Sequence, residues 1–312
     1  MRIICKDYIK GSNKPCLHYA NGSCTLSHRF ICIEYIRRKK PLISPSMIST
    51  FTRCKRAFYY SYIEGLESIE TNKNMLLGQL MHVLLQHYHT GSEDMLVKQS
   101  VIMNNYEKFY SEDITEIAKC FAILDCYKEI YSADGNSRCE VEFRKEEDGY
   151  YIRGFIDYID SEGKIYDFKY TSRPDSYTIF TTELQAGIYL MLTKANSITF
   201  RIITKPSLRL KDNEENEEYY ARLVEDIRRR PAHYFSDITF YKSEYDFEQI
   251  EQYLSTVTSE IKRLVELDID SYYQNRSACM CPSQCEFLPI CEAKGLKPEN
   301  LYRKKEVDYD IF

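Results

Sequence analysis

The sequence predicts an α/β protein in which a mixed sheet with an antiparallel meander is flanked by helices. In the middle of the chain, helical spacing gives way to three short stretches rich in β-branched and aromatic residues, at 140–143, 150–159 and 164–170. Asp148-Gly149 separates the first two, and Ser161-Glu162-Gly163 separates the last two. Both separators are hairpin signals, so the three stretches are expected to pair as consecutive antiparallel strands.

Helices are predicted on both sides of this meander. Ser44 and Pro45 form a good helix start, because serine caps a helix and proline suits its first position. Apolar spacing predicts helices before the meander at about 44–65, 75–89 and 101–131. After it, the pattern predicts a helix at 181–194, a strand at 198–204, and helices at 214–230 and 246–267.

The chain divides into a small appendage, residues 1–42, and a main domain, residues 43–312. In the appendage Cys, Gly and polar turn residues outnumber any periodic apolar pattern. Its ligand-type side chains could form a structural zinc site, with Cys5 or His18 as substitute ligands. The candidate zinc ligands are Cys16, Cys24, His28 and Cys32. Free thiols are the alternative.

Composition excludes some classes of protein. The formal net charge of -5 argues against a histone-like binder of nucleic acid, although locally clustered basic residues could still contact it. No stretch of about 18 apolar residues and no signal-peptide pattern is found, so a cytoplasmic protein without membrane contact is expected. In that reducing compartment the 12 cysteines point to metal binding rather than disulfides.

The meander predicts a row of carboxylates. Counting outward from the two turns places Glu140 opposite Asp157, and Asp157 opposite Asp167, with neighbouring Cβ atoms about 5 Å apart. Lys169 is two residues beyond Asp167 and so projects from the same face. Adjacent like charges destabilise a sheet unless a cation lies between them, which predicts a Mg²⁺ or Mn²⁺ site suited to phosphodiester hydrolysis. A solvent-exposed acidic sheet face is the alternative.

Four motifs in order carry a resemblance to a known family. They are Gly78-Gln79-Leu80-Met81-His82, Gly154-Phe155-Ile156-Asp157, Asp167-Phe168-Lys169 and Gln185-Ala186-Gly187-Ile188-Tyr189. Over about residues 44–291 the chain resembles the RecB-like branch of the PD-(D/E)XK nuclease superfamily, which includes AddB-type subunits and CRISPR-associated iron-sulfur exonucleases. The resemblance implies a restriction-endonuclease-like core.

The resemblance also implies residue roles. Lys169 would be the catalytic lysine and Glu140 an auxiliary acid, while Gln185 and Tyr189, one helical turn apart, would position DNA. The metal ligands would be His82, Asp157, Asp167 and the backbone carbonyl of Phe168. Taken alone, His82 would more often be a helix histidine without a ligand, and Gln185 and Tyr189 an ordinary amphipathic pair.

The late cysteines form a second candidate site. Cys279, Cys281, Cys285 and Cys291 lie within one short segment, and thiols this close seldom serve only as apolar side chains. By the resemblance, Cys54 would join three of them around a 4Fe-4S cluster. Cys285 and Cys291 fit the family spacing, whereas the third late ligand could be Cys279 or Cys281. Tetrahedral zinc is the alternative. The remaining thiols, Cys120, Cys126 and Cys139, are interpreted as core residues.

These features together predict a metal-dependent DNA nuclease. By the resemblance it would be an exonuclease acting on single-stranded or frayed ends, in recombination, repair or CRISPR-type DNA processing. A helicase, a recombinase or another DNA-processing protein would be its partner. The main alternative is a non-catalytic DNA-binding or scaffold subunit of a nuclease complex, and a second is a zinc protein that binds nucleic acid through its front segment.

Overall fold

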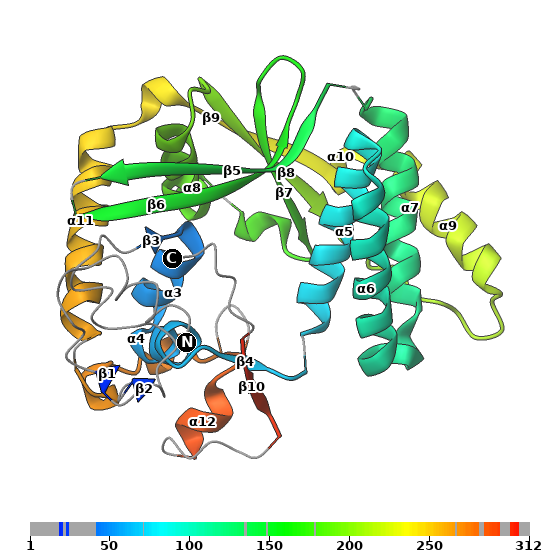
Figure 1. Ribbon diagram of the computed structural model, residues 1–312. Helices are drawn as coiled ribbons and strands as arrows, with labels where there is room; N and C mark the ends of the chain where they lie inside the picture. Colours follow the sequence, from blue (N-terminus) through cyan, green and yellow to red (C-terminus); the bar gives the residue numbers. More distant parts are fainter. Residues whose placement is uncertain are drawn as a thin grey trace. The chain divides into compact units, whose positions relative to one another are not determined.

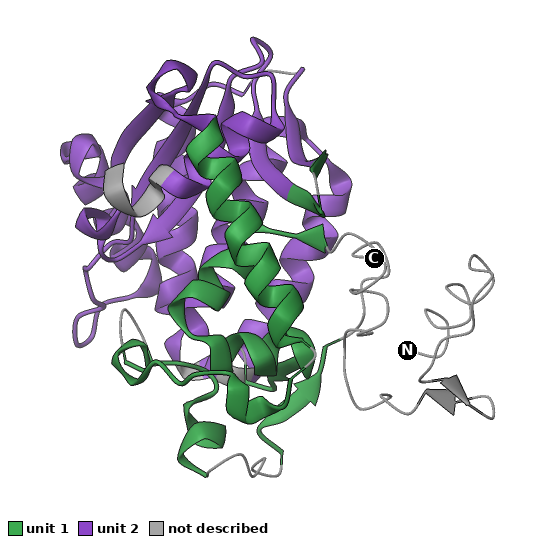
Figure 2. Ribbon diagram, turned by 90° about the vertical axis from the view of Figure 1, so that its left-hand side faces the viewer, with its two compact units in different colours: residues 1–70, 144–153, 248–312 green, residues 71–143, 154–247 purple. Residues whose placement is uncertain are grey.

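The computed structural model describes residues 19–20, 23–24, 42–70, 72–133, 136–147, 149–177, 179–265, 267–280, 284–293 and 300–305. The chain forms two compact units, coloured separately in Figure 2: unit 1 contains residues 1–70, 144–153 and 248–312, and unit 2 contains residues 71–143 and 154–247. Almost all of the expected appendage lies outside the described residues, as does Cys281.

Unit 2 is built on a mixed sheet, as the sequence predicts. Its central strand β7 (Ile165–Thr171) runs antiparallel to β6 (Tyr150–Ile159) and parallel to β8 (Ser197–Thr204). Strand β9 (Phe235–Tyr241) pairs antiparallel with β8, and β5 (Arg138–Glu147) pairs with β6 (Figure 1). The expected meander and the strand at 198–204 are therefore confirmed.

The turn between β6 and β7 is fixed by one side chain. Asp160 Oδ1 accepts the backbone N–H groups of Glu162 at 3.0 Å and Lys164 at 2.8 Å. Gly163 supplies the left-handed conformation that the turn needs, with φ +79°. The resulting register pairs Tyr158 with Tyr166, as expected for a turn centred on Glu162.

Helices cover both faces of the unit 2 sheet. On one face α5 (Lys73–Thr90), α7 (Thr115–Ile130) and α9 (Asn216–Arg229) share a core with Phe168 and Ile203. On the other face α8 (Ile179–Leu192) packs through Ala186 and Leu190 on Phe200. Helix α6 (Glu93–Tyr110) lies alongside α5 (Figure 1). Alternate residues of β7 and β8 thus contact different helical layers.

Two long helices expected from the sequence are interrupted. The expected 101–131 helix is wrong: α6 ends at Tyr110, and a 3-10 turn at Ser111–Asp113 precedes α7. Asp113 competes with helix propagation, because its side chain accepts the Thr115 hydroxyl at 2.9 Å and its carbonyl accepts the Tyr106 hydroxyl at 3.0 Å. The 44–65 helix is interrupted at Cys54, whose backbone is extended.

Strand β9 was not anticipated. It begins directly after the short helix α10 (Pro231–Tyr234) and alternates between buried and exposed residues only weakly. An ion pair secures it: the buried Arg201 of β8 donates from Nε and Nη2 to the carboxylate of the exposed Asp237 on β9, at 3.0 and 2.9 Å. The guanidinium of Arg201 also lies 3.8 Å from the ring centre of Tyr131.

Unit 1 contains the ends of the chain. Helix α3 (Pro45–Arg53) begins as expected, with the Ser44 hydroxyl accepting the Met47 N–H at 3.2 Å. It is followed by α4 (Lys55–Phe58) and a π-helical turn, Tyr59–Ile63. The other elements are β3 (Leu42–Ile43), which pairs parallel with the start of β6, the two-stranded sheet of β4 (Leu66–Ser68) and β10 (Tyr302–Lys304), α11 (Phe247–Leu264) and α12 (Leu288–Glu292). Among the described helices, none has the length and apolar composition to span a bilayer.

Candidate functional site

The candidate site is built around the middle of β7. Asp167 and Lys169 project from the same face of this strand, and Phe168 between them projects from the other. Phe168 is fully buried and stacks on Tyr158, so the backbone that carries the two charged residues is anchored in the core. Asp167 is only 3% exposed, which makes it one of the few buried carboxylates in unit 2.

Asp157 comes to this point from β6. The backbone pairing of β6 with β7 ends at Tyr158 and Tyr166, one residue before the two acids. Beyond that point Asp157 Oδ2 accepts the backbone N–H of Phe168 at 2.7 Å. A side-chain oxygen thus takes the place of a strand carbonyl: the backbone pairing ends before Asp157 and Asp167, and Asp157 contacts the peptide N–H beside Asp167 instead.

His82 approaches Asp157 from α5. Its Nδ1 lies 3.4 Å from Asp157 Oδ2, and its side chain is 30% exposed. Burial lowers the pKa of His82, but the carboxylate of Asp157 outweighs that effect and the net shift is upward. Burial raises the pKa of Asp157, but His82 and the Phe168 N–H outweigh it and the net shift is downward. Each partner therefore favours the charged form of the other.

Lys169 and Gln185 hold the two oxygens of Asp167. Lys169 Nζ lies 2.5 Å from Asp167 Oδ1, and Gln185 Nε2 donates to Asp167 Oδ2 at 3.1 Å. Lys169 also donates to Gln185 Oε1 at 3.4 Å. Burial raises the pKa of Asp167 to about 6, with the ammonium of Lys169 opposing the rise. Burial lowers the pKa of Lys169, but Asp167 outweighs this and its pKa lies above the ordinary value.

Helix α8 supplies Gln185 and Tyr189 as one unit. The two residues are one turn apart, and Gln185 Nε2 donates to the Tyr189 hydroxyl at 3.1 Å. Tyr189 is 7% exposed and packs against β6 at Gly154. A Cβ at Gly154 would lie 2.9 Å from Tyr189 Cε1 and 3.0 Å from Leu192 Cδ1. The glycine of this motif is therefore needed for close packing of α8 on the strand.

Glu140 lies apart from this contact network. Its Oε1 accepts Gln86 Nε2 at 3.1 Å and its Oε2 lies 3.2 Å from Lys98 Nζ, so it is bound to α5 and α6. Its backbone has φ +51°, an irregularity that a regular strand count does not foresee. Gln86 follows His82 by one helical turn. This spacing is the sequence signal that could have placed Gln86 near the site.

A cavity of about 700 Å³ links Glu140 with His82 along α5 and α6. Gly78 and Gln79 line it, and a Cβ at Gly78 would meet no atom within 4 Å. The glycine of the first motif thus borders open space, in contrast to Gly154.

The described late cysteines share a cavity in unit 1. Cys54, Cys279, Cys285 and Cys291 all line a space of about 430 Å³. Cys54 stands at the break between α3 and α4, and the Cys285 N–H donates to the Cys279 carbonyl at 2.7 Å. Burial raises the pKa of Cys291, and the neighbouring Cys285 and Cys54 add to the rise. Cys54 and three of the four late candidates for the cluster therefore line one cavity.

The remaining described thiols belong to the core. Cys120 and Cys126 are buried, and Cys139 is half-buried. The zinc ligands expected at Cys16, His28 and Cys32 lie outside the described residues, and only the backbone of Cys24 is described, in β2 (Ser23–Cys24), paired with β1 (Tyr19–Ala20).

The donor atoms present fit two kinds of metal. Two carboxylates and an imidazole, from Asp157, Asp167 and His82, suit Mg²⁺ or Mn²⁺, whereas four thiols suit an iron-sulfur cluster or zinc. Among the described residues, no three His, Cys, Asp or Glu side chains already have the arrangement of a metal cage. At the first site, Asp167 Oδ1 contacts Lys169 and Oδ2 accepts from Gln185.

Comparison with known proteins gives one strong match. The family model of the PD-(D/E)XK nuclease superfamily matches residues 42–292. No curated protein matches the sequence. A solved structure of SSO0001 has 15% identity and a TM-score of 0.32 over 82% of this chain and 96% of its own. A predicted exonuclease from Eubacterium rectale has 12% identity and a TM-score of 0.44 over 89% of this chain and 96% of its own.

Both structural likenesses are distant, so the assignment depends on the family match. That match covers most of the chain and contains every residue of the β7 site and the described cysteine cavity. The mixed sheet between two helical layers is consistent with the restriction-endonuclease-like fold. The chain belongs to the PD-(D/E)XK nuclease superfamily.

Proposed function

We propose that this protein is a metal-dependent deoxyribonuclease that hydrolyses phosphodiester bonds at the β7 site. The observation that carries the proposal is the contact of Asp157 with the peptide N–H between Asp167 and Lys169. This contact brings two carboxylates and one ammonium to a single point from two strands. A chain that merely kept the fold would have no need to retain a buried carboxylate beside a lysine.

The residues present would hold Mg²⁺ or Mn²⁺. We assign Asp157, Asp167 and the carbonyl of Phe168 as its oxygen ligands, the donors that hard cations prefer, and His82 as a nitrogen ligand. When bound, the ion would contact the scissile phosphate and lower the pKa of a water molecule. His82 is oriented for this role by Asp157, and Asp167 by Gln185.

Other residues of the site would stabilise charge, orient water and position the DNA. Lys169 holds an ammonium 2.5 Å from Asp167, where it can offset the negative charge that builds on the phosphate during attack and orient the incoming water. Gln185 fixes both Lys169 and Asp167, and Tyr189 fixes Gln185. Gln185 and Tyr189 would also position the DNA backbone. Glu140, bordering the cavity next to His82, would act as an auxiliary acid.

We further propose an exonuclease of the RecB-like iron-sulfur branch, acting on single-stranded or frayed ends. The motif order supports this branch, and so does the cavity shared by Cys54, Cys279, Cys285 and Cys291. These four thiols would hold a 4Fe-4S cluster that ties α4 to the C-terminal segment, with zinc as the alternative. The role would be structural, because hydrolysis needs no electron transfer. The same proposal includes a zinc module in residues 1–42. It also includes a helicase or recombinase as partner.

Cleavage of end-labelled DNA tests the proposal. The protein would be purified without oxygen and incubated with single- or double-stranded DNA in Mg²⁺, Mn²⁺ or EDTA, beside Asp167→Ala and Lys169→Ala. Metal-dependent cleavage by the wild type alone supports a nuclease at this site, and the product ladder gives its polarity. Equal inertness of all three proteins towards DNA that they bind would favour a scaffold subunit.

A further inference from the structure

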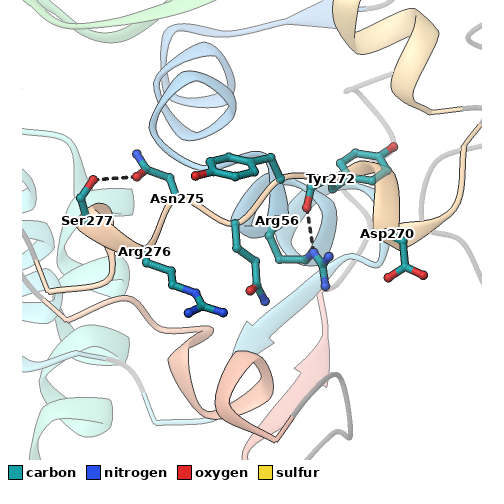
Figure 3. A pocket seen from close by; sticks show the side chains of 8 residues that line it. Arg56, Asp270, Tyr272, Asn275, Arg276 and Ser277 are labelled. Carbon is teal, nitrogen blue, oxygen red and sulfur yellow. Dashed lines mark hydrogen bonds between the residues drawn. The ribbon is translucent and has the colours of Figure 1, made fainter.

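A second polar cavity in unit 1 lies next to the cysteine cavity. It has a volume of about 620 Å³, and residues 274–276 line both cavities. Its wall includes two arginines, Arg56 and Arg276 (Figure 3), and the strongly exposed Tyr273. The family motifs and the β7 site use none of these residues.

The wall of this cavity is held in a fixed shape. Arg56 Nε donates to the Tyr272 carbonyl at 3.0 Å, and the Arg56 N–H donates to the Tyr273 carbonyl at 3.2 Å. Asn275 is held at both ends of its amide: Nδ2 donates to the Arg53 carbonyl at 2.9 Å, and Oδ1 accepts the Ser277 hydroxyl at 2.6 Å. A guanidinium held in place loses little side-chain entropy when it binds an anion.

The charges favour an anion. Two arginines, Arg56 and Arg276, line this cavity together with one acid, Asp270, which lies on the far side of Arg56 from Arg276 in Figure 3. Planar guanidinium groups match the oxygens of phosphate, often through two hydrogen bonds. Two arginines on one wall suit a ligand with successive phosphates better than a single ion.

Tyr273 narrows the class of ligand further. This residue is 72% exposed, although its backbone carbonyl accepts the N–H of Arg56. An exposed aromatic ring beside arginines is the arrangement by which proteins bind single-stranded nucleic acid, with bases stacked on the ring and phosphates on the guanidinium groups. Bases in a duplex are already stacked on one another, so they would gain nothing from this ring.

We propose that this cavity binds single-stranded DNA, with phosphates at Arg56 and Arg276 and a base on Tyr273. The choice of DNA as ligand rests on the proposed function. Binding would require a base on the strand but would show no sequence preference, because any base can stack on an aromatic ring.

Binding measured without cleavage tests the proposal. Fluorescence anisotropy of a labelled thymidine oligomer would be recorded in EDTA with Asp167→Ala protein that retains its cysteine-bound metal. Arg276→Glu and Tyr273→Ala would be added to this parent, with Arg263→Glu and Tyr253→Ala on α11 as matched surface controls in the same unit. Far-ultraviolet circular dichroism and thermal unfolding would establish that each variant is folded.

Arg276→Glu should weaken binding about tenfold or more, the size expected for a charge-assisted hydrogen bond. It should also reduce the magnitude of the log-log salt slope by about 0.7 for each lost phosphate contact. Tyr273→Ala should weaken binding about fivefold or more on the thymidine oligomer and much less on an abasic oligomer of equal length, which keeps the phosphates but has no base to stack. Competition by inorganic phosphate as effective as that by the oligomer would identify a simple anion site and overturn the proposal.

The outcome can be separated from that of the proposed function. If the wild type cleaves DNA but the two cavity variants bind like their controls, the cavity proposal is wrong and the nuclease proposal stands. If the cavity variants lose binding while no form of the protein cleaves DNA in Mg²⁺ or Mn²⁺, the cavity proposal is supported and the nuclease proposal fails.

Discussion

Asp157 accepts the backbone N–H of Phe168 at 2.7 Å, so one carboxylate both completes the pairing of two strands and faces His82. The same oxygen, Oδ2, makes both contacts. Asp157 therefore has a structural role in addition to its charge, and different substitutions can keep or remove the contact with Phe168 while both remove the charge.

Asp157→Asn and Asp157→Ala should differ in stability but not in activity. Asparagine can still accept the Phe168 N–H through its amide oxygen, whereas alanine leaves that N–H without its partner, which costs about 1–3 kcal/mol. Both variants should lose about a hundredfold or more in DNA cleavage, because neither supplies the carboxylate charge. Urea denaturation in EDTA would measure stability, and equal stabilities of the two variants would contradict the structural role.

Lys169→Met should destabilise the protein in EDTA at neutral pH. Asp167 would then be a buried carboxylate without its cation, and loss of one partner of a buried pair costs about 3 kcal/mol. The double variant with Asp167→Asn should recover much of this loss, because the uncompensated charge is gone. A double-mutant cycle from urea denaturation measures the coupling, and additive effects would show that the pair is not coupled.

Gly154→Ala should lower both stability and activity, while Gly78→Ala should not lower stability. The new Cβ at position 154 would press on Tyr189 and Leu192, which costs about 1–3 kcal/mol and moves the helix that carries Gln185. At position 78 the new Cβ meets no atom within 4 Å and lies in helix α5, so alanine should stabilise by up to about 1 kcal/mol. Thermal unfolding distinguishes the two, and an unchanged Gly154→Ala protein would argue against close packing of α8.

Glu116 should make a pH-dependent contribution to stability. Burial raises the pKa of Glu116, but hydrogen bonds from Lys119 and Lys205 outweigh it, and the pKa lies below its ordinary value of 4.5. The contribution is therefore complete above pH 4.5 and is lost as the pH falls through the lowered value. Glu116→Gln should cost about 2 kcal/mol at pH 7 and progressively less below pH 4.5. The exposed Glu217→Gln is the control, and a constant difference across this range would exclude the assignment.

Cys285→Ser should remove the metal of unit 1, whereas Cys126→Ser should retain it. Cys285 lines the cavity with three other thiols, while Cys126 is a buried core residue. Protein purified without oxygen should be brown and contain iron, and metal analysis of both variants would follow the loss. Comparison of Cys279→Ser with Cys281→Ser would assign the fourth ligand. Zinc in a colourless wild type would replace the iron-sulfur assignment.

The elements near the site could be predicted because their signals are local. The 150–159 strand and the register across Glu162 follow from alternation and turn residues, and the structure has both. Lys169 faces the same way as Asp167 because they are two residues apart in one strand. Helix α5 also agrees with its expected range to within two residues.

What could not be predicted depends on tertiary contacts. Strand β9 is secured by the partnership of Arg201 with Asp237, which no local pattern reveals. The bond of Glu140 to Gln86 and Lys98 depends on a positive φ in β5 and on the packing of α6. The break before α7 combines local contacts of Asp113 with Tyr106 and Thr115 and a long-range ion pair with Lys73 of α5, which apolar spacing does not reveal.

The Asp160 turn has a consequence for how this chain can change. Neighbouring residues of β7 belong to opposite environments, so a shift of one position would bring Phe168 to the place of a charged residue and drive Asp167 or Lys169 into the apolar layer. The carboxylate of Asp160 opposes such a shift from the surface by binding two backbone N–H groups of the turn. A substitution of Asp160 would thus lower activity in the same way as a substitution in the site, although Asp160 need not contact a substrate.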